Sequence, residues 1–293
     1  MPIIGKLINF SKRTKLPGLE GLTLYELLRI YIAGIIEGAV NYKAGSIAFT
    51  FFMALFPFAL FLLNLIPYIP IENFQESFLL FVEQNVPPNT YDAIELILID
   101  IMNNSYHSLI STGVIMSVIF MSNGVNAIIN GFQSSAHLTI SRNVFNQYLV
   151  AIVLSVLLSL MLVLSLAVYL SVEVLMHVSD YPLFADLGRN AFVLSMVLLT
   201  VSILYKFGTK EIKHIAFISY GSVFTTVLMA LTSIGFGFYV SKFAKYNELY
   251  GSIGTLLVIM IYIWINCMIL LLGFELNAAI YKAKRKNAYI SSN

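Results

Sequence analysis

The stretch "SIGTLLVIMIYIWINCMILLLGFELN", residues 252–277, decides the fold class, because its only charged residue is Glu275. A helix that crosses a bilayer needs about 20 mainly apolar residues. Five other segments meet this requirement: residues 45–68, 109–132, 147–171, 190–207 and 214–239. Of the 293 residues, 59% are apolar and 11% are charged, whereas about 25% are charged in a typical soluble domain. The sequence therefore predicts an all-α polytopic membrane helix bundle with six transmembrane helices.

The distribution of Lys and Arg predicts the orientation of this bundle, because basic residues concentrate on the cytoplasmic side of membrane proteins. Residues 69–108 contain no Lys or Arg but several Asp and Glu. Six spans place this acidic segment outside, and fourteen of the seventeen basic residues inside. We therefore expect a multi-pass protein of the bacterial inner (plasma) membrane, with both termini in the cytoplasm.

Amphipathic stretches flank the spans and complete the predicted organisation. Residues 1–43 form a cytoplasmic segment with an amphipathic helix, 44–281 the membrane domain, and 282–293 a basic tail. The N-terminal helix is typical of helices that lie in the membrane interface, and it suits packing on the protein's own cytoplasmic face equally well. Within 69–108, two short amphipathic stretches separated by two prolines predict external helices on the membrane surface or on the bundle.

Amides and other polar residues form two stripes inside the predicted spans. At about 100° per residue, Asn123, Asn126 and Asn130 share one face of the second span, and Tyr262 and Asn266 share one face of the sixth. In one interpretation these groups hydrogen-bond across helices and hold the bundle together. In the other they line a cavity for a solute or a lipid headgroup. A cavity bordered by the stripes would favour transport, whereas stripes that meet each other in a closed bundle would exclude this route.

Glu275 is the acidic residue that falls within a predicted span, and an ionisable group there is a functional candidate by default. It lies near the cytoplasmic end of the span, where hydration or pairing with the basic tail is an alternative. Pro57 predicts a kink in the first span. Gly251, Gly254 and Gly273 are candidate hinge positions, with close helix packing as the alternative.

Motifs for enzyme chemistry are missing from the sequence. No pair of its four histidines has metal-ligand spacing, and the single cysteine, Cys267, cannot complete a thiolate site. HExxH, GxSxG and P-loop patterns are absent as well. We therefore predict no catalytic residues, no metal, no cofactor and no nucleic-acid partner.

Three stretches resemble motifs of the YihY/BrkB family of bacterial inner-membrane proteins. They are "KAGSIAFTFFMALFPFALFL", "TGVIMSVIFMSNGVNAIINGFQ" and "YNELYGSIGTLLVIMIYIWINCMILLLGFELNAAI", and the likeness covers about residues 25–282. Pro57, Asn126 or Asn130, Tyr250, Gly251, Gly273 and Glu275 match motif positions of the family. Many relatives carry a basic run after the second span, where this chain has only Arg142.

The resemblance implies a role in envelope integrity, and the family has also carried the label ribonuclease BN. RNA hydrolysis usually needs a metal site or an acid–base pair, and the sequence indicates neither on the cytoplasmic side, so we predict a protein that is not an enzyme. The first hypothesis is a transporter or lipid-handling protein with membrane lipids as partners. The alternative is a non-transporting scaffold that recruits envelope proteins through its acidic external segment. The sequence does not predict the oligomeric state.

Overall fold

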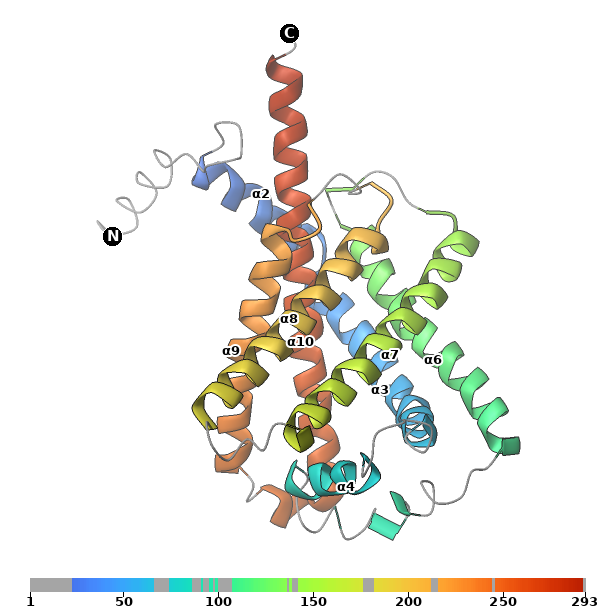
Figure 1. Cartoon of the computed structure of the whole chain (residues 1–293). Helices are drawn as coiled ribbons and strands as arrows, with labels where there is room; N and C mark the ends of the chain where they lie inside the picture. The colour runs from blue at the N-terminus through green and yellow to red at the C-terminus, as the bar shows by residue number, and fades with distance from the viewer. Residues whose placement is uncertain are drawn as a thin grey trace. The chain divides into compact units, whose positions relative to one another are not determined.

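A computed structural model describes residues 23–65, 74–85, 91, 95–96, 98–99, 107–135, 137–138, 142–175, 182–211, 216–243 and 246–291. In these ranges all of the extended regular elements are helices, which confirms the predicted all-α class. They are α2 (Leu24–Glu37), α3 (Val40–Leu65), α4 (Phe74–Asn85), α6 (His107–Gln133), α7 (Val144–Leu175), α8 (Pro182–Gly208), α9 (Tyr220–Phe243) and α10 (Tyr246–Ser291) (Figure 1).

Five of these helices contain segments that are long and apolar enough to cross a membrane. The segments are Ile115–Gln133, Val144–Tyr169, Leu187–Gly208, Tyr220–Tyr239 and Leu256–Arg285. They correspond to the second to sixth predicted spans. The first predicted span falls on α3, whose side chains are described only in part, so the number of six spans stays a prediction.

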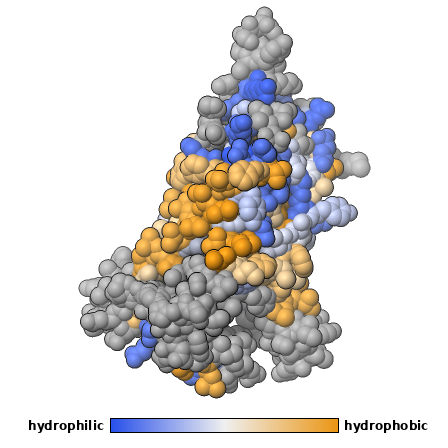
Figure 2. Space-filling model, turned by 90° about the vertical axis from the view of Figure 1, so that its right-hand side faces the viewer, coloured by the Kyte–Doolittle hydropathy of each residue, from blue (hydrophilic) through white to orange (hydrophobic). Residues whose placement is uncertain are grey.

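Apolar side chains stay exposed along the candidate spans, as they would in contact with lipid. On α7, Leu160 is 59% exposed and Leu164 63% exposed. Figure 2 shows hydrophobic residues gathered into a broad area of one molecular face. Soluble monomers rarely expose apolar patches of this kind, so the chain is a polytopic membrane protein.

Contacts between residues divide the chain into two units. The first comprises residues 1–50, 126–150 and 197–293, and the second comprises 51–125 and 151–196. The candidate site lies in the first unit. In the second unit, Pro57 lies inside α3, and its carbonyl accepts a 2.6 Å hydrogen bond from the Ser117 hydroxyl of α6.

The core of the first unit is an aromatic cluster on α6, α8 and α10. The rings of Phe132 and Phe274 stack with centroids 4.3 Å apart, and Tyr205 meets both rings edge-on. All three side chains are buried. Aromatic pairs in these geometries are worth about 0.5–1.5 kcal/mol beyond their buried area, so the cluster fixes the three helices against one another.

Helix α2 begins with a capping box, because Thr23 and Glu26 each bind the other's backbone N–H. Its Leu27 is buried against Ala279, Ile280 and Ala283 of α10, and Figure 1 shows α2 beside α10. Other apolar residues of α2, including Ile32 and Ile36, are exposed. One face of α2 thus packs on the protein, and an apolar face remains for a membrane interface.

Helix α10 has 46 residues and is about 70 Å long at 1.5 Å per residue. This is more than twice the roughly 30 Å of a bilayer's hydrocarbon core. Gly251 and Gly254 lie inside this helix, because α10 begins at Tyr246. The predicted sixth span starts at residue 252, whereas the helix starts earlier and continues into the basic tail.

Candidate functional site

Glu275 is the centre of a buried polar cluster in the first unit. It projects from α10 and is 2% exposed. The Ser135 hydroxyl donates a 2.9 Å hydrogen bond to its Oε2 atom, and His137 Nε2 lies 4.0 Å from the same oxygen. Ser135 and His137 belong to the segment between α6 and α7. A carboxyl group near the end of a spanning helix is therefore covered by a connection rather than by lipid.

The hydrogen bonds of His137 fix its tautomer. Nε2 lies 3.1 Å from the Ile30 carbonyl of α2, and a carbonyl can only accept, so Nε2 carries the proton. Nδ1 is then free to accept from the Lys282 ammonium, which lies 3.4 Å away. Burial and, next, the charge of Lys282 lower the pKa of His137 below its ordinary value. Both ring nitrogens of His137 are thus engaged, and its surroundings favour the neutral form.

Gly34 of α2 and Gly38, which caps the end of this helix, let it approach the cluster. A Cβ atom at Gly34 would overlap the His137 ring and lie 3.0 Å from Glu275 Oε2, and one at Gly38 would lie 3.3 Å from Glu275 Oε1. Only glycine leaves this space, so α2 covers the carboxylate at close range.

Tyr31 and Lys43 complete the surroundings of Glu275. The Tyr31 hydroxyl donates to the Leu272 carbonyl at 3.2 Å, and burial, followed by the charge of Glu275, raises the pKa of Tyr31 to about 12. The Lys43 ammonium donates to the Ser134 carbonyl at 2.7 Å, directly after α6. A cation near the C-terminal end of a helix also complements the helix dipole.

On another side of α10, Asn277 joins this helix to α9. Its Oδ1 accepts from the Gly221 backbone N–H at 2.8 Å, and its Nδ2 donates to the Ser219 hydroxyl at 2.8 Å. A Cβ atom at Gly273 would overlap the Thr225 hydroxyl. The candidate hinge position Gly273 therefore lies at a close contact between two helices, as small residues commonly do in membrane bundles.

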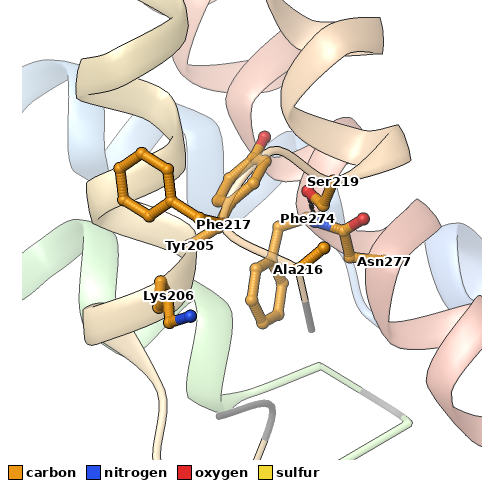
Figure 3. A pocket seen from close by; sticks show the side chains of 7 residues that line it. All are labelled: Tyr205, Lys206, Ala216, Phe217, Ser219, Phe274 and Asn277. Atoms are coloured by element: carbon orange, nitrogen blue, oxygen red, sulfur yellow. Dashed lines mark hydrogen bonds between the residues drawn. The ribbon is translucent and has the colours of Figure 1, made fainter. Parts of the chain in front are cut away.

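A small pocket adjoins this contact (Figure 3). Tyr205, Lys206, Phe217, Phe274 and Asn277 contribute to its lining. It has room for about one water molecule, which is too little for a solute or a headgroup.

The amides of α6 bind a partner that the sequence analysis did not identify. Gln147 of α7 is buried, and its Nε2 donates to Asn126 Oδ1 at 2.7 Å and to Asn130 Oδ1 at 2.6 Å. Both asparagines of α6 thus hydrogen-bond to a side chain of another helix, as expected if the amides hold the bundle together. Asn123 lies in the second unit and is partly buried.

The stripe of α10 also meets protein groups. The Tyr262 and Ser233 hydroxyls lie 2.7 Å apart, and Asn266 Nδ2 donates to the Tyr262 carbonyl at 2.8 Å. Asn126, Asn130, Tyr262 and Asn266 thus contact protein groups, and Glu275 remains as the candidate for transport.

Sequence reasoning singled out Glu275 but missed the residues around it. Ser135 and His137 lie about 140 positions earlier in the chain, and Gly34 and Lys43 lie earlier still. A buried carboxylate does imply a hydrogen-bond donor, yet nothing in the spacing indicates which one. Among the described residues, no group of three His, Cys, Asp or Glu could hold a metal ion.

Comparisons with known proteins give a family match and several relatives. A family model described as "Virulence factor BrkB" matches residues 32–291. The putative ribonuclease-like protein YfkH of Bacillus subtilis is 31% identical over 251 residues, which are 83% of this chain and 90% of that protein. A UPF0761 membrane protein of Alteromonas mediterranea is 22% identical over 89% of each chain. No solved structure matches.

Proposed function

From the premise that this chain belongs to the BrkB family of membrane proteins, we propose that it is a transport protein of the bacterial inner membrane, with cytoplasmic termini. It moves a small solute or a lipid headgroup and thereby supports envelope integrity. Membrane lipids are its partners in this proposal, and Glu275 is the residue whose charge state the transport cycle requires.

The observation that carries the proposal is the burial of Glu275 in a spanning helix. An ionisable side chain costs several kcal/mol inside a membrane bundle unless it is paired, and such residues typically mark substrate and ion pathways. A serine hydroxyl and a histidine ring lie beside Glu275, Lys43 interacts with its charge, and Lys282 contacts the histidine. These are more polar groups than the joining of two helices requires, since the single side chain of Asn277 already joins α10 to α9.

The cover over Glu275 supports a site that opens and closes. Helix α2 and the segment between α6 and α7 cover the carboxylate through hydrogen bonds and glycine contacts, and Leu27 of α2 adds an apolar contact with α10. Interhelical hydrogen bonds in membrane proteins are worth only about 0.6 kcal/mol on average. In this proposal the polar part of the cover separates at a small energetic cost, which a transport cycle needs.

The same geometry favours transport over hydrolysis of RNA. The curated relative of Bacillus subtilis is named ribonuclease-like, but this chain's His137 is 7% exposed, and both of its ring nitrogens have partners. A general acid or base must reach the substrate proton within about 3 Å. His137 and Glu275 face each other instead, so we propose a non-catalytic role.

The proposal is tested with purified full-length protein in proteoliposomes. Lipid scrambling is measured with fluorescent headgroup-labelled lipids, and solute flux with a panel of labelled solutes. Wild type should exceed empty liposomes, and Glu275→Gln should abolish the excess. The control Glu83→Gln removes a carboxylate from the exposed face of α4 and should retain it. Flux equal to that of empty liposomes, or undiminished flux in Glu275→Gln, would refute the proposal.

A further inference from the structure

Within the described part of the chain, three buried donor atoms near the end of α6 have no hydrogen-bond partner. They are Gln133 Nε2, Arg142 Nη1 and Thr209 Oγ1. Thr209 is 1% exposed, and its hydroxyl is among the polar atoms shielded from solvent. More than 90% of buried polar groups in proteins are paired, and the exceptions often mark a missing water or ion. Three in one neighbourhood call for a physical explanation.

Hydrogen bonds and packing bring the three residues together. The Arg142 backbone N–H donates to Gln133 Oε1 at 3.2 Å, so the neighbouring Nε2 atom lies beside the Arg142 backbone. Arg142 Nη2 lies 3.5 Å from the Phe207 carbonyl, two residues before Thr209. The end of α8 also contacts the end of α6, because a Cβ atom at Gly208 would lie 3.1 Å from the Phe132 ring. The donors therefore come from three elements that meet at one place.

The chemistry of this set is that of an anion site. A guanidinium and an amide N–H₂ group can only donate hydrogen bonds, and a hydroxyl can donate one as well. The guanidinium also carries a positive charge. Lys206 and Lys210 flank the segment and add positive charge. The acidic residue of the same segment, Glu211, lies 3.6 Å from Arg285 and is neutralised there. Guanidinium groups bind phosphate oxygens strongly, since the planar fork can make two parallel bonds.

We propose that Gln133, Arg142 and Thr209 form a binding site for a phosphate group, carried by a lipid headgroup or by free phosphate. The Arg142 side chain is the movable part. It is partly exposed, and its bond to the Phe207 carbonyl is long and therefore weak. In this proposal the Arg142 side chain shifts to admit the phosphate, and its guanidinium then binds the phosphate together with Gln133 Nε2 and Thr209 Oγ1. The site shares no residue with the cluster around Glu275, and binding here does not depend on transport.

The test uses the detergent-solubilised full-length chain and three probes: inorganic phosphate, phosphatidylglycerol and uncharged diacylglycerol. The readout is the rise in thermal midpoint with probe concentration, from which an apparent Kd follows. A rise with inorganic phosphate identifies the free ion as a ligand, and a rise with phosphatidylglycerol alone identifies the headgroup. Either result supports the site. No rise with either phosphate probe, or an equal rise with diacylglycerol, overturns it.

Variants connect the effect to the three residues. Arg142→Gln should weaken binding about tenfold or more, because it removes a charge-assisted hydrogen bond. Thr209→Val should weaken binding about fivefold without lowering the thermal midpoint of the unliganded protein, since it removes a hydroxyl that has no partner. A purely structural role for Thr209 would not produce this combination.

Two controls keep the test decisive. Arg29→Gln removes an exposed guanidinium on α2, and Ser202→Ala removes another unpartnered hydroxyl, about 10 Å away along α8. Both should bind as wild type does. If Arg142→Gln fails to fold, Thr209→Val and Arg142→Lys carry the test. Unchanged affinity in Thr209→Val, or a loss as large in Ser202→Ala, overturns the proposed site.

Discussion

Replacing Gly273 by alanine should disrupt the contact between α9 and α10. The added methyl group would overlap the Thr225 hydroxyl and would lie 2.6 Å from the Tyr205 hydroxyl oxygen. These two hydroxyls lie 2.6 Å apart as a buried hydrogen-bonded pair. Neither group can retreat easily, since the Tyr205 hydroxyl also donates to the Leu270 carbonyl at 2.7 Å.

The magnitude follows from two costs and one gain. Overpacking by a methyl group costs about 1–3 kcal/mol, and loss of the hydroxyl pair costs about 1 kcal/mol. Alanine returns up to about 1 kcal/mol through its higher helix propensity. We therefore expect Gly273→Ala to lower the free energy of unfolding by about 1–3 kcal/mol.

The assay is equilibrium unfolding in mixed micelles of sodium dodecyl sulfate and a non-ionic detergent, followed by circular dichroism. Gly235→Ala is the matched control, because a Cβ atom at this position of α9 meets nothing within 4 Å. This control should keep or slightly raise the stability of wild type. Equal stability of the Gly273→Ala and Gly235→Ala variants would refute the close contact and the reasoning built on it.

Three further predictions follow. Gln147→Leu leaves the two α6 asparagines without their shared donor and should cost about 1–2 kcal/mol in the same unfolding assay; an unchanged midpoint would contradict the proposed joint. Burial, followed by the nearby ammonium, lowers the pKa of His137 below 6.5. The unfolded chain therefore takes up this proton first as the pH falls, and stability decreases between pH 6.5 and the lowered pKa. Thermal midpoints should show this decrease in wild type and a smaller one in His137→Gln, and identical pH profiles would argue against it. For the topology, a cysteine introduced by Asp92→Cys should react with a membrane-impermeant reagent from outside intact cells; labelling only after lysis would reverse the predicted orientation.

The fold class was predictable because hydrophobic length and charge content are properties of composition. Runs of about 20 apolar residues have few alternatives to a membrane helix, and five of the six predicted spans fall on helices that can cross a bilayer. The start of α10 was less predictable, because residues before position 252 are more polar although the helix includes them.

The candidate site was predictable only where one residue is anomalous by itself. Glu275 stands out because a carboxyl group in an apolar run is costly. Gln147 and His137 stand out much less, since each lies near a predicted helix end, where polar residues are ordinary. Their importance arises from partners far away in the chain, and periodicity within one helix carries no information about such partners. The role proposed for Arg142 could not be predicted from the sequence. It rests on a structural observation, a buried nitrogen that has no partner among the described residues.

Residues 270–277 of α10 connect four other elements within about two turns. The carbonyls of Leu270 and Leu272 bind α8 and α2, Glu275 binds the segment after α6, and Asn277 binds α9. Rotation of α10 would disturb all four connections together. Substitutions on these separate elements should therefore be non-additive in double-mutant cycles, although the mutated residues do not touch one another. A disturbance at any one of the four elements can therefore be transmitted through this segment to the other three.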